Sequence, residues 1–191
     1  MSISKPCPGS ETAIRPVKLS DAAAVADIYN HYVGHTDISF ETQPLTPDAM
    51  RARIEALCAD VRLHLDSGEP PYYVSLSHGI VTGYCYAHAW KERAAYNRTL
   101  ETTVYVSPSS LHQGIGTALM QRLISHIKTL GTFHALIACI TGGNTASCRM
   151  HEKLGFRRVS CFTNVGFKFG RYIDVTDYEL ELPQTTEPKL T

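Results

Sequence analysis

The stretch from residue 100 to residue 140 places the strongest constraint on the fold. Residues 100–106 form a β-rich run that stops at Ser107-Pro108, which predicts a strand. A glycine-containing turn follows, and residues 116–130 repeat apolar side chains at helical spacing. Residues 135–140 are a short continuous apolar run, typical of a strand buried on both faces. A strand, a helix and a second strand in this order predict a crossover between parallel strands.

The flanking segments predict further strands and helices. Residues 72–76 and 80–89 are β-rich and are joined by a turn that contains glycine, which predicts a hairpin. A helix is expected from Ser20 as N-cap, and another from Thr46-Pro47 to about residues 67–68. Strand-like segments follow at residues 157–162 and 172–182. We therefore expect an α/β fold of mixed, partly α+β, character, with a central mixed sheet flanked by helices.

Length and composition bound the domain organisation. The chain has 191 residues, of which 43% are hydrophobic and 19% are charged, so one packed domain is expected. We assign this domain to residues 13–182. Residues 1–12 and 183–191 are rich in Pro, Ser, Thr and charge and are expected to be flexible tails.

Several classes of partner are not expected. Eighteen basic residues balance eighteen acidic ones, which argues against nucleic acid as a ligand. No apolar run approaches the ~20 residues that span a bilayer, and the first residues do not resemble a secretory signal, so we expect no membrane partner and a cytoplasmic protein. The six cysteines have no metal-ligand spacing, and no third ligand accompanies His31 and His35, so no metal is expected.

The turn at residues 111–118 could hold an anion. It leads from a strand directly into a helix, where backbone N–H groups and the helix dipole favour negative charge, and its glycines allow close approach. A phosphate or pyrophosphate is the expected ligand, and an ordinary turn is the alternative. The turn lacks Gly-Lys-Ser/Thr, so it is not a P-loop. It also lacks a third glycine and a following acidic residue, so it is not a dinucleotide fingerprint.

A second motif, Asn-Thr-Ala-Ser-Cys-Arg-Met-His-Glu-Lys-Leu-Gly-Phe at residues 144–156, follows the buried strand. With the turn, it resembles the acyl-CoA-binding core of the GNAT superfamily of N-acetyltransferases. The chain departs from that pattern at Leu111, where the superfamily usually has Gln or Arg. Further blocks, at residues 29–44, 83–108, 149–152 and 165–175, are similar to the phosphinothricin and methionine sulfone or sulfoximine acetyltransferase group. Taken together, the resemblance covers about residues 13–182.

The resemblance implies a function. We expect transfer of an acetyl group from acetyl-CoA to the α-amine of a small amino acid or an analogue of the phosphinothricin or methionine sulfone type, without a metal. It also implies a homodimer, with residues 165–175 near the shared substrate cleft. The alternatives are a related transferase that acts on a protein N-terminus or a polyamine, and a non-catalytic acyl-CoA-binding module.

Glu101 and His151 are the expected catalytic residues. The resemblance places the general base at Glu101, which composition alone would assign to the surface of a strand. Such a base is needed because an amine with a pKa of about 8 to 10 is protonated at pH 7 and cannot attack a thioester. The resemblance places at His151 the group that protonates the departing thiolate, and simple contact with the cofactor is the alternative.

The resemblance also assigns the binding residues. Cofactor contacts are expected from the strand, from the turn with the first helical residues, and from one residue before the last helix: Val104, Tyr105, Val106, His112, Gln113, Gly114, Ile115, Gly116, Thr117, Ala118 and Asn144. An ordinary helix N-cap is the alternative for Asn144. Lys91 and Arg93 are expected to bind a substrate carboxylate, with a solvated surface pair as the alternative. Thr36, Phe40 and Tyr96 complete the expected substrate pocket.

Overall fold

The protein is built on an eight-stranded mixed sheet. The structure is a computed structural model and describes residues 12–60 and 69–183, so the predicted tails lie almost wholly outside the described residues. The strand order is β1-β2-β3-β4-β5-β8-β6, and β7 pairs with β8. Along the chain the elements are β1 (Thr12–Pro16), α1 (Ala22–His35), α2 (Pro47–Ala59), β2 (Tyr72–Ser77), β3 (Ile80–Ala89), β4 (Thr99–Val106), α3 (Ile115–Leu130), β5 (Ala135–Thr141), α4 (Thr145–Lys153), β6 (Arg157–Arg158), β7 (Phe162–Lys168) and β8 (Arg171–Glu181).

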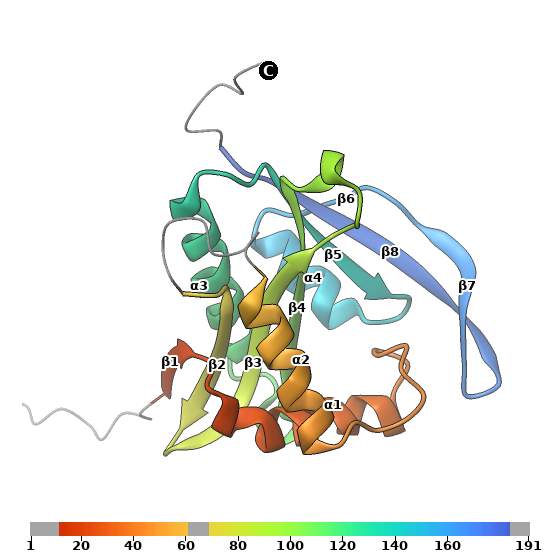
Figure 1. Ribbon diagram of the computed structural model, residues 1–191. Helices are drawn as coiled ribbons and strands as arrows, with labels where there is room; N and C mark the ends of the chain where they lie inside the picture. The colour runs from red at the N-terminus through yellow and green to blue at the C-terminus, as the bar shows by residue number, and fades with distance from the viewer. Residues whose placement is uncertain (1–11, 61–68, 184–191) are drawn as a thin grey trace, which may run out of the picture.

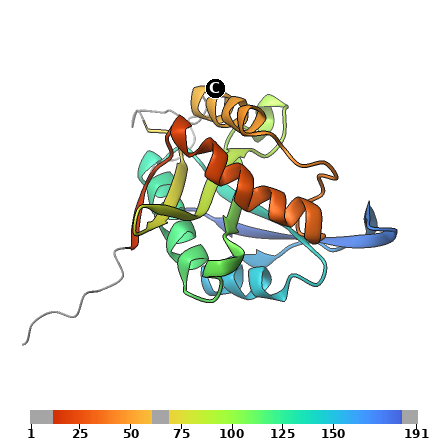
Figure 2. The same ribbon diagram turned by 90° about the horizontal axis from the view of Figure 1, so that it is seen from below.

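Helices cover both faces of the sheet. β4 and β5 pair in parallel and α3 connects them, which confirms the predicted crossover, and the other strand pairs are antiparallel. Figures 1 and 2 show α1 and α2 on one face, α3 and α4 on the other, and the β7–β8 hairpin extending beyond them. The expected mixed sheet flanked by helices is confirmed.

Each face of the sheet has its own apolar core. On one face, Leu119, Leu123 and Ile127 of α3 are at most 1% exposed and pack with Tyr73 and Leu136 of the sheet. On the other, α1 and α2 pack against the opposite side of β2 and β3. The helical spacing of these apolar residues in the sequence therefore predicted correctly which faces of the helices are buried.

Three element boundaries differ from the sequence prediction. Ser20 does not cap α1, because a short 3-10 turn at Leu19–Asp21 precedes the helix and the Asp21 carboxylate binds the Arg15 guanidinium at 2.7 and 2.8 Å. Thr46 does cap α2, but the helix ends at Ala59, whereas the predicted end at residues 67–68 lies outside the described residues. The predicted strand at residues 157–162 is instead the two-residue β6, and β7 begins at Phe162.

Candidate active site

The site lies where two parallel strands separate. β4 and β5 pair only over Thr99–Glu101 and Ala135–Ile137, although β4 continues to Val106 and β5 to Thr141. A cavity of about 340 Å³ opens at this point. Its walls come from α1 and the loop after it, from α2, from the three strands β3, β4 and β5, and from α4 with its N-cap: Tyr29, Ile38, Ser39, Phe40, Glu41, Arg53, Tyr86, His88, Glu101, Thr102, Thr103, Val104, Tyr105, Ala138, Cys139, Ile140, Thr141, Asn144, Ser147 and His151.

Glu101 is the last β4 residue that pairs with β5, and its side chain lines the cavity. The side chain is 25% exposed, and its Oε1 atom lies 4.0 Å from Nε2 of His88, which is opposite it on β3. Burial raises the pKa of the Glu101 carboxyl and Asp177 adds to the rise, which outweighs the lowering by His88. A carboxylate with a raised pKa in a cavity is chemically suited to accept a proton.

His151 lines the same cavity from α4. Its side chain is buried, its Nδ1 lies 2.9 Å from the Ser147 carbonyl oxygen, and burial lowers its pKa. The ring is therefore neutral near pH 7, with Nδ1–H donating to Ser147 and Nε2 carrying a lone pair. Within the described residues, this Nε2 and Thr141 Oγ1 are the buried side-chain polar atoms without a hydrogen-bond partner. Two such atoms in the wall of one cavity indicate a place for a ligand.

The turn before α3 lies beside the end of β4 and beside α4, and none of its residues lines the cavity. His112 and Gly114 have φ values of 62° and 79°, and the first helical bond runs from the Ala118 N–H to the Gly114 carbonyl at 3.0 Å. The amides that precede Ala118 at the helix start therefore have no intrahelical acceptor. A Cβ atom on Gly116 would lie 3.2 Å from Met150 Sδ and 3.5 Å from Val106 Cγ2, so the helix start packs tightly between α4 and the end of β4.

The expected cofactor-binding residues fall into three adjacent groups. Val104, Tyr105 and Asn144 line the cavity, and the residues from His112 to Ala118 form the turn and the first turn of α3. Val106 ends β4 between these two groups, and its carbonyl accepts a 2.6 Å hydrogen bond from the Tyr32 hydroxyl. Asn144 is also the N-cap of α4, where its side-chain oxygen accepts from the Ser147 N–H at 3.2 Å.

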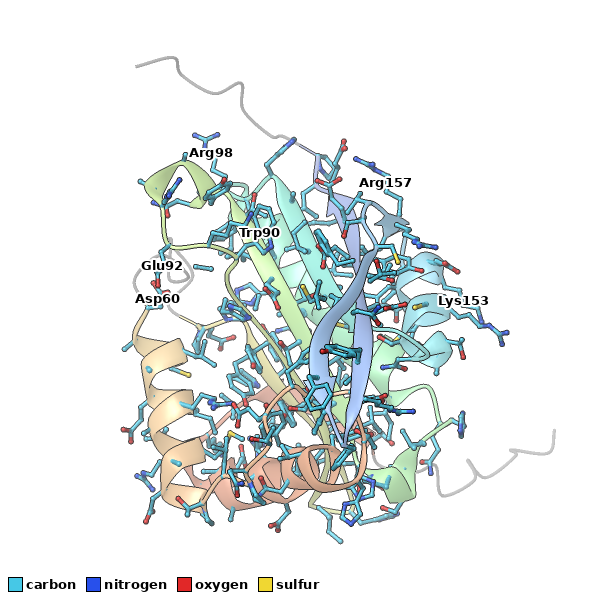
Figure 3. All side chains as sticks on the ribbon, turned by 90° about the vertical axis from the view of Figure 1, so that its right-hand side faces the viewer. Asp60, Trp90, Glu92, Arg98, Lys153 and Arg157 are labelled. Atoms are coloured by element: carbon cyan, nitrogen blue, oxygen red, sulfur yellow. The ribbon has the colours of Figure 1, made fainter. Side chains whose placement is uncertain are left out.

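The expected substrate-binding residues do not all come together. Phe40 lines the cavity with Glu101, and Thr36 lines a neighbouring cavity of about 540 Å³ that shares Asn144 with it. Lys91, Arg93 and Tyr96 line neither cavity. They belong to the β3–β4 connection, which Trp90, Glu92 and Arg98 mark in Figure 3, at the opposite end of the sheet from the start of α3. There the Lys91 Nζ atom lies 3.9 Å from the centre of the Trp90 ring.

The structure adds a guanidinium that the sequence reasoning missed. Arg53 of α2 lines the cavity, and its Nη2 donates to Glu41 Oε1 at 2.7 Å. A signal for it exists in the sequence, because Arg53 lies three residues after Met50 and four before Leu57, within the apolar stripe of the helix. His88 is a second addition, and only the β3–β4 register reveals that it faces Glu101.

Two further observations concern metals and membranes. Over residues 12–60 and 69–183, no three His, Cys, Asp or Glu side chains are grouped so that they could hold a metal ion. No helix in these ranges combines the length and apolar character needed to cross a bilayer.

The comparisons with known proteins identify the family of the chain. Residues 26–156 match the Acetyltransferase (GNAT) family, a region that includes β4, the turn, α3, β5 and α4. The chain is 41% identical to a phosphinothricin N-acetyltransferase of Alcaligenes faecalis over 162 residues, which are 84% of this chain and 78% of the relative. It is 35% identical to the L-methionine sulfoximine/L-methionine sulfone acetyltransferase of Salmonella typhimurium over 175 residues, 92% and 97% of the two chains.

The fold comparison leads to the same group. A crystal structure of a GNAT superfamily phosphinothricin acetyltransferase from Sinorhizobium meliloti, in complex with acetyl-CoA, matches with a TM-score of 0.85 and 30% identity. The match covers 94% of this chain and 93% of that one. The chain therefore belongs to the GNAT family of acetyltransferases and is related to its phosphinothricin and methionine sulfoximine acetyltransferases.

Proposed function

We propose that this protein transfers the acetyl group of acetyl-CoA to the α-amine of a small amino acid or analogue, with Glu101 as the general base. The observation that carries the proposal is the cavity between the separating strands, which Glu101 and the unpartnered Nε2 atom of His151 both line. The names of the relatives support substrates of the phosphinothricin and methionine sulfone or sulfoximine type.

Acetyl-CoA would lie along the end of β4, from the cavity to the start of α3. The pantetheine arm would pair with the backbone of Val104 and Val106 as an added strand does. The amides of the turn from His112 to Ala118 would hold the pyrophosphate, helped by the helix dipole. Leu111 offers no polar group, so this contact falls to the backbone. Asn144 uses its oxygen to cap α4, which leaves its amide NH2 as a donor to the arm.

The first chemical step is removal of a proton from the substrate ammonium by Glu101. The free amine then attacks the thioester carbonyl, and backbone N–H groups near Val104 and Val106 stabilise the oxygen as it becomes negative. The raised pKa of Glu101 supports this role, because it narrows the difference in proton affinity between the carboxylate and the amine.

His151 would move the second proton. Because its Nδ1–H is committed to the Ser147 carbonyl and the ring is neutral, it must first accept a proton before it can donate one. Its Nε2 therefore takes the remaining proton of the acylated amine and passes it to the departing CoA thiolate. This order keeps the histidine neutral at the start and the end of each turnover.

A cation is needed for the carboxylate of an amino-acid substrate. Arg53 is the guanidinium in the described wall of the cavity. It binds Glu41 and also interacts with Tyr29, and its remaining N–H groups would bind the carboxylate. Lys91 and Arg93 remain the candidates from the sequence. They would have to reach the substrate from the β3–β4 connection, whereas Arg53 already lines the cavity. Arg53→Gln should therefore raise KM for the amino acid more than Arg93→Gln does.

We also propose that the protein is a homodimer, joined through the β7–β8 hairpin. Large apolar side chains on this hairpin are 50–68% exposed, which is unusual for a monomer surface: Phe162, Val165, Phe167, Phe169 and Tyr172. Light scattering at micromolar concentration tests this directly. Replacement of Phe167 by Ser should produce a monomer, whereas a wild-type monomer would refute the proposal.

The alternatives differ in what they require. A polyamine substrate calls for an acidic pocket, whereas this cavity contains Arg53 as well as Glu41 and Glu101. A non-catalytic acyl-CoA-binding module would bind acetyl-CoA but acetylate no amine.

Release of CoA thiol from acetyl-CoA should be measured with free amino acids, phosphinothricin, methionine sulfone, methionine sulfoximine, spermidine and a short peptide. We expect turnover with free amino acids or their analogues, and a loss of about 100-fold or more in Glu101→Gln. Turnover of peptide or spermidine alone would refute the substrate class. Binding of acetyl-CoA without any turnover would favour the binding module.

A further inference from the structure

His88 of β3 is fixed in a defined tautomer beside the general base. Its Nδ1 atom lies 3.0 Å from the carbonyl oxygen of Ala89, and a carbonyl oxygen can only accept. Nδ1 therefore carries a hydrogen, and in the neutral ring Nε2 carries a lone pair. This Nε2 is the atom that lies 4.0 Å from Glu101 Oε1, and both side chains line the cavity.

Two acceptors at this separation can share one donor. A nitrogen placed about 2.8 Å from each acceptor, a normal hydrogen-bond length, would see them at an angle of about 90°. A primary ammonium group has N–H bonds in roughly these directions, and so can donate one hydrogen to Glu101 and another to His88. Neither acceptor alone fixes the orientation of the ammonium nitrogen, but two acceptors do.

In the described cavity wall, His88 is the histidine that lies beside Glu101. The other titratable and charged side chains nearby come from α2, β3, β5 and β8: Arg53, Tyr86, Cys139 and Asp177. Burial raises the pKa of both Tyr86 and Cys139, so these two remain neutral near pH 7. Histidine is the side chain whose charge ordinarily changes between pH 5 and 8.

Given the proposed transfer to an amine, we propose that His88 and Glu101 act as a pair that binds the substrate ammonium and removes its proton. One N–H of the ammonium donates to each acceptor. The proton that leaves goes first to Glu101 Oε1. After the product has left, a water molecule that bridges the 4.0 Å between the two side chains passes it to His88 Nε2, which restores the carboxylate. His88 releases it to solvent, to which 32% of its side chain is exposed.

The test compares kcat/KM for an amino acid from pH 5.5 to 9 in the wild type, His88→Ala, His88→Gln and Glu101→Gln. His78→Asn is the matched control, because His78 lies in the β2–β3 turn with a φ of 49°, which Asn adopts readily. We expect His88→Ala to lose about 10- to 100-fold in kcat/KM at pH 8, with KM for acetyl-CoA unchanged. His78→Asn should match the wild type.

The pH profile separates a catalytic role from a structural one. A protonated imidazole cannot accept a hydrogen bond, so in the acidic part of the pH range the ratio of kcat/KM of the wild type to that of His88→Ala should approach one. Added imidazole should restore activity to His88→Ala. A ratio that stays constant with pH, without rescue, would overturn the proposal for His88, and His88→Gln provides the same comparison if the alanine variant does not fold. An active Glu101→Gln enzyme would instead overturn the general base in the proposed function.

Discussion

Gly166 of β7 lies against the ring of Phe40, and this contact joins the hairpin to the cavity. A Cβ atom on Gly166 would lie 2.4 Å from Phe40 Cε1, about 1 Å closer than an ordinary contact. Gly166 does not have a positive φ, so Gly166→Ala adds a steric conflict without backbone strain. Phe40 is 47% exposed, so its ring can turn outward and lose the burial of about half its surface. Because full burial of Phe contributes about 1.5–3 kcal/mol, the expected cost is about 1 kcal/mol.

A double-mutant cycle isolates this cost. Urea unfolding should show that Gly166→Ala destabilises the wild type by about 1 kcal/mol. In a Phe40→Ala background the same change should be neutral or stabilising by about 0.5 kcal/mol, because alanine suits a strand interior better than glycine. Since Phe40 lines the cavity, Gly166→Ala should also raise KM for the amine and leave KM for acetyl-CoA unchanged. An equal cost of Gly166→Ala in both backgrounds would refute the contact as its cause.

Three further predictions concern pH, the general base and the turn. Burial lowers the pKa of His126 and His151, so the unfolded chain binds protons below about pH 6.5 that the folded chain does not. The free energy of unfolding should therefore fall between pH 7 and pH 5, and less steeply in His151→Asn; an unchanged slope would contradict this. The pKa of Glu101 is raised, so its ionisation disfavours the fold at higher pH, and Glu101→Gln should raise Tm at pH 7.5 while lowering turnover by about 100-fold or more. Gly114→Ala should cost about 1–2 kcal/mol of stability, because φ is 79°, and should weaken CoA binding in calorimetry without changing KM for the amine.

Short sequence patterns predicted most of the secondary structure, because each pattern depends on residues within a single helix or strand. The apolar spacing of α3, the proline at the start of α2 and the continuous apolar run of β5 each reflect one element and its burial. The errors fell where a contact with a residue outside the element decided the outcome. Arg15 engages Asp21 and sets the start of α1, and pairing with β8 makes a hairpin strand of residues 162–168.

The candidate site likewise combines residues that a local motif predicts with residues that only the tertiary structure brings together. The chain positions of Glu101, Asn144 and His151 follow a motif that can be read along the sequence, and all three line one cavity. Arg53 and His88 belong to no such motif, and their role depends on which strands and helices lie side by side. The places of Lys91 and Arg93 could not be derived from sequence, because charge composition does not say to which end of the sheet a connection belongs.

By itself the sequence determined the class of fold, the strand–turn–helix–strand unit and the residue types available for acetyl transfer, since these depend on spacing within short segments. The tertiary structure decided that β4 and β5 separate after Glu101, that His88 lies opposite Glu101 on β3, and that Arg53 lines the same cavity. The physical reason is that strand register and helix packing are fixed by contacts between residues far apart in the chain, which no local pattern encodes.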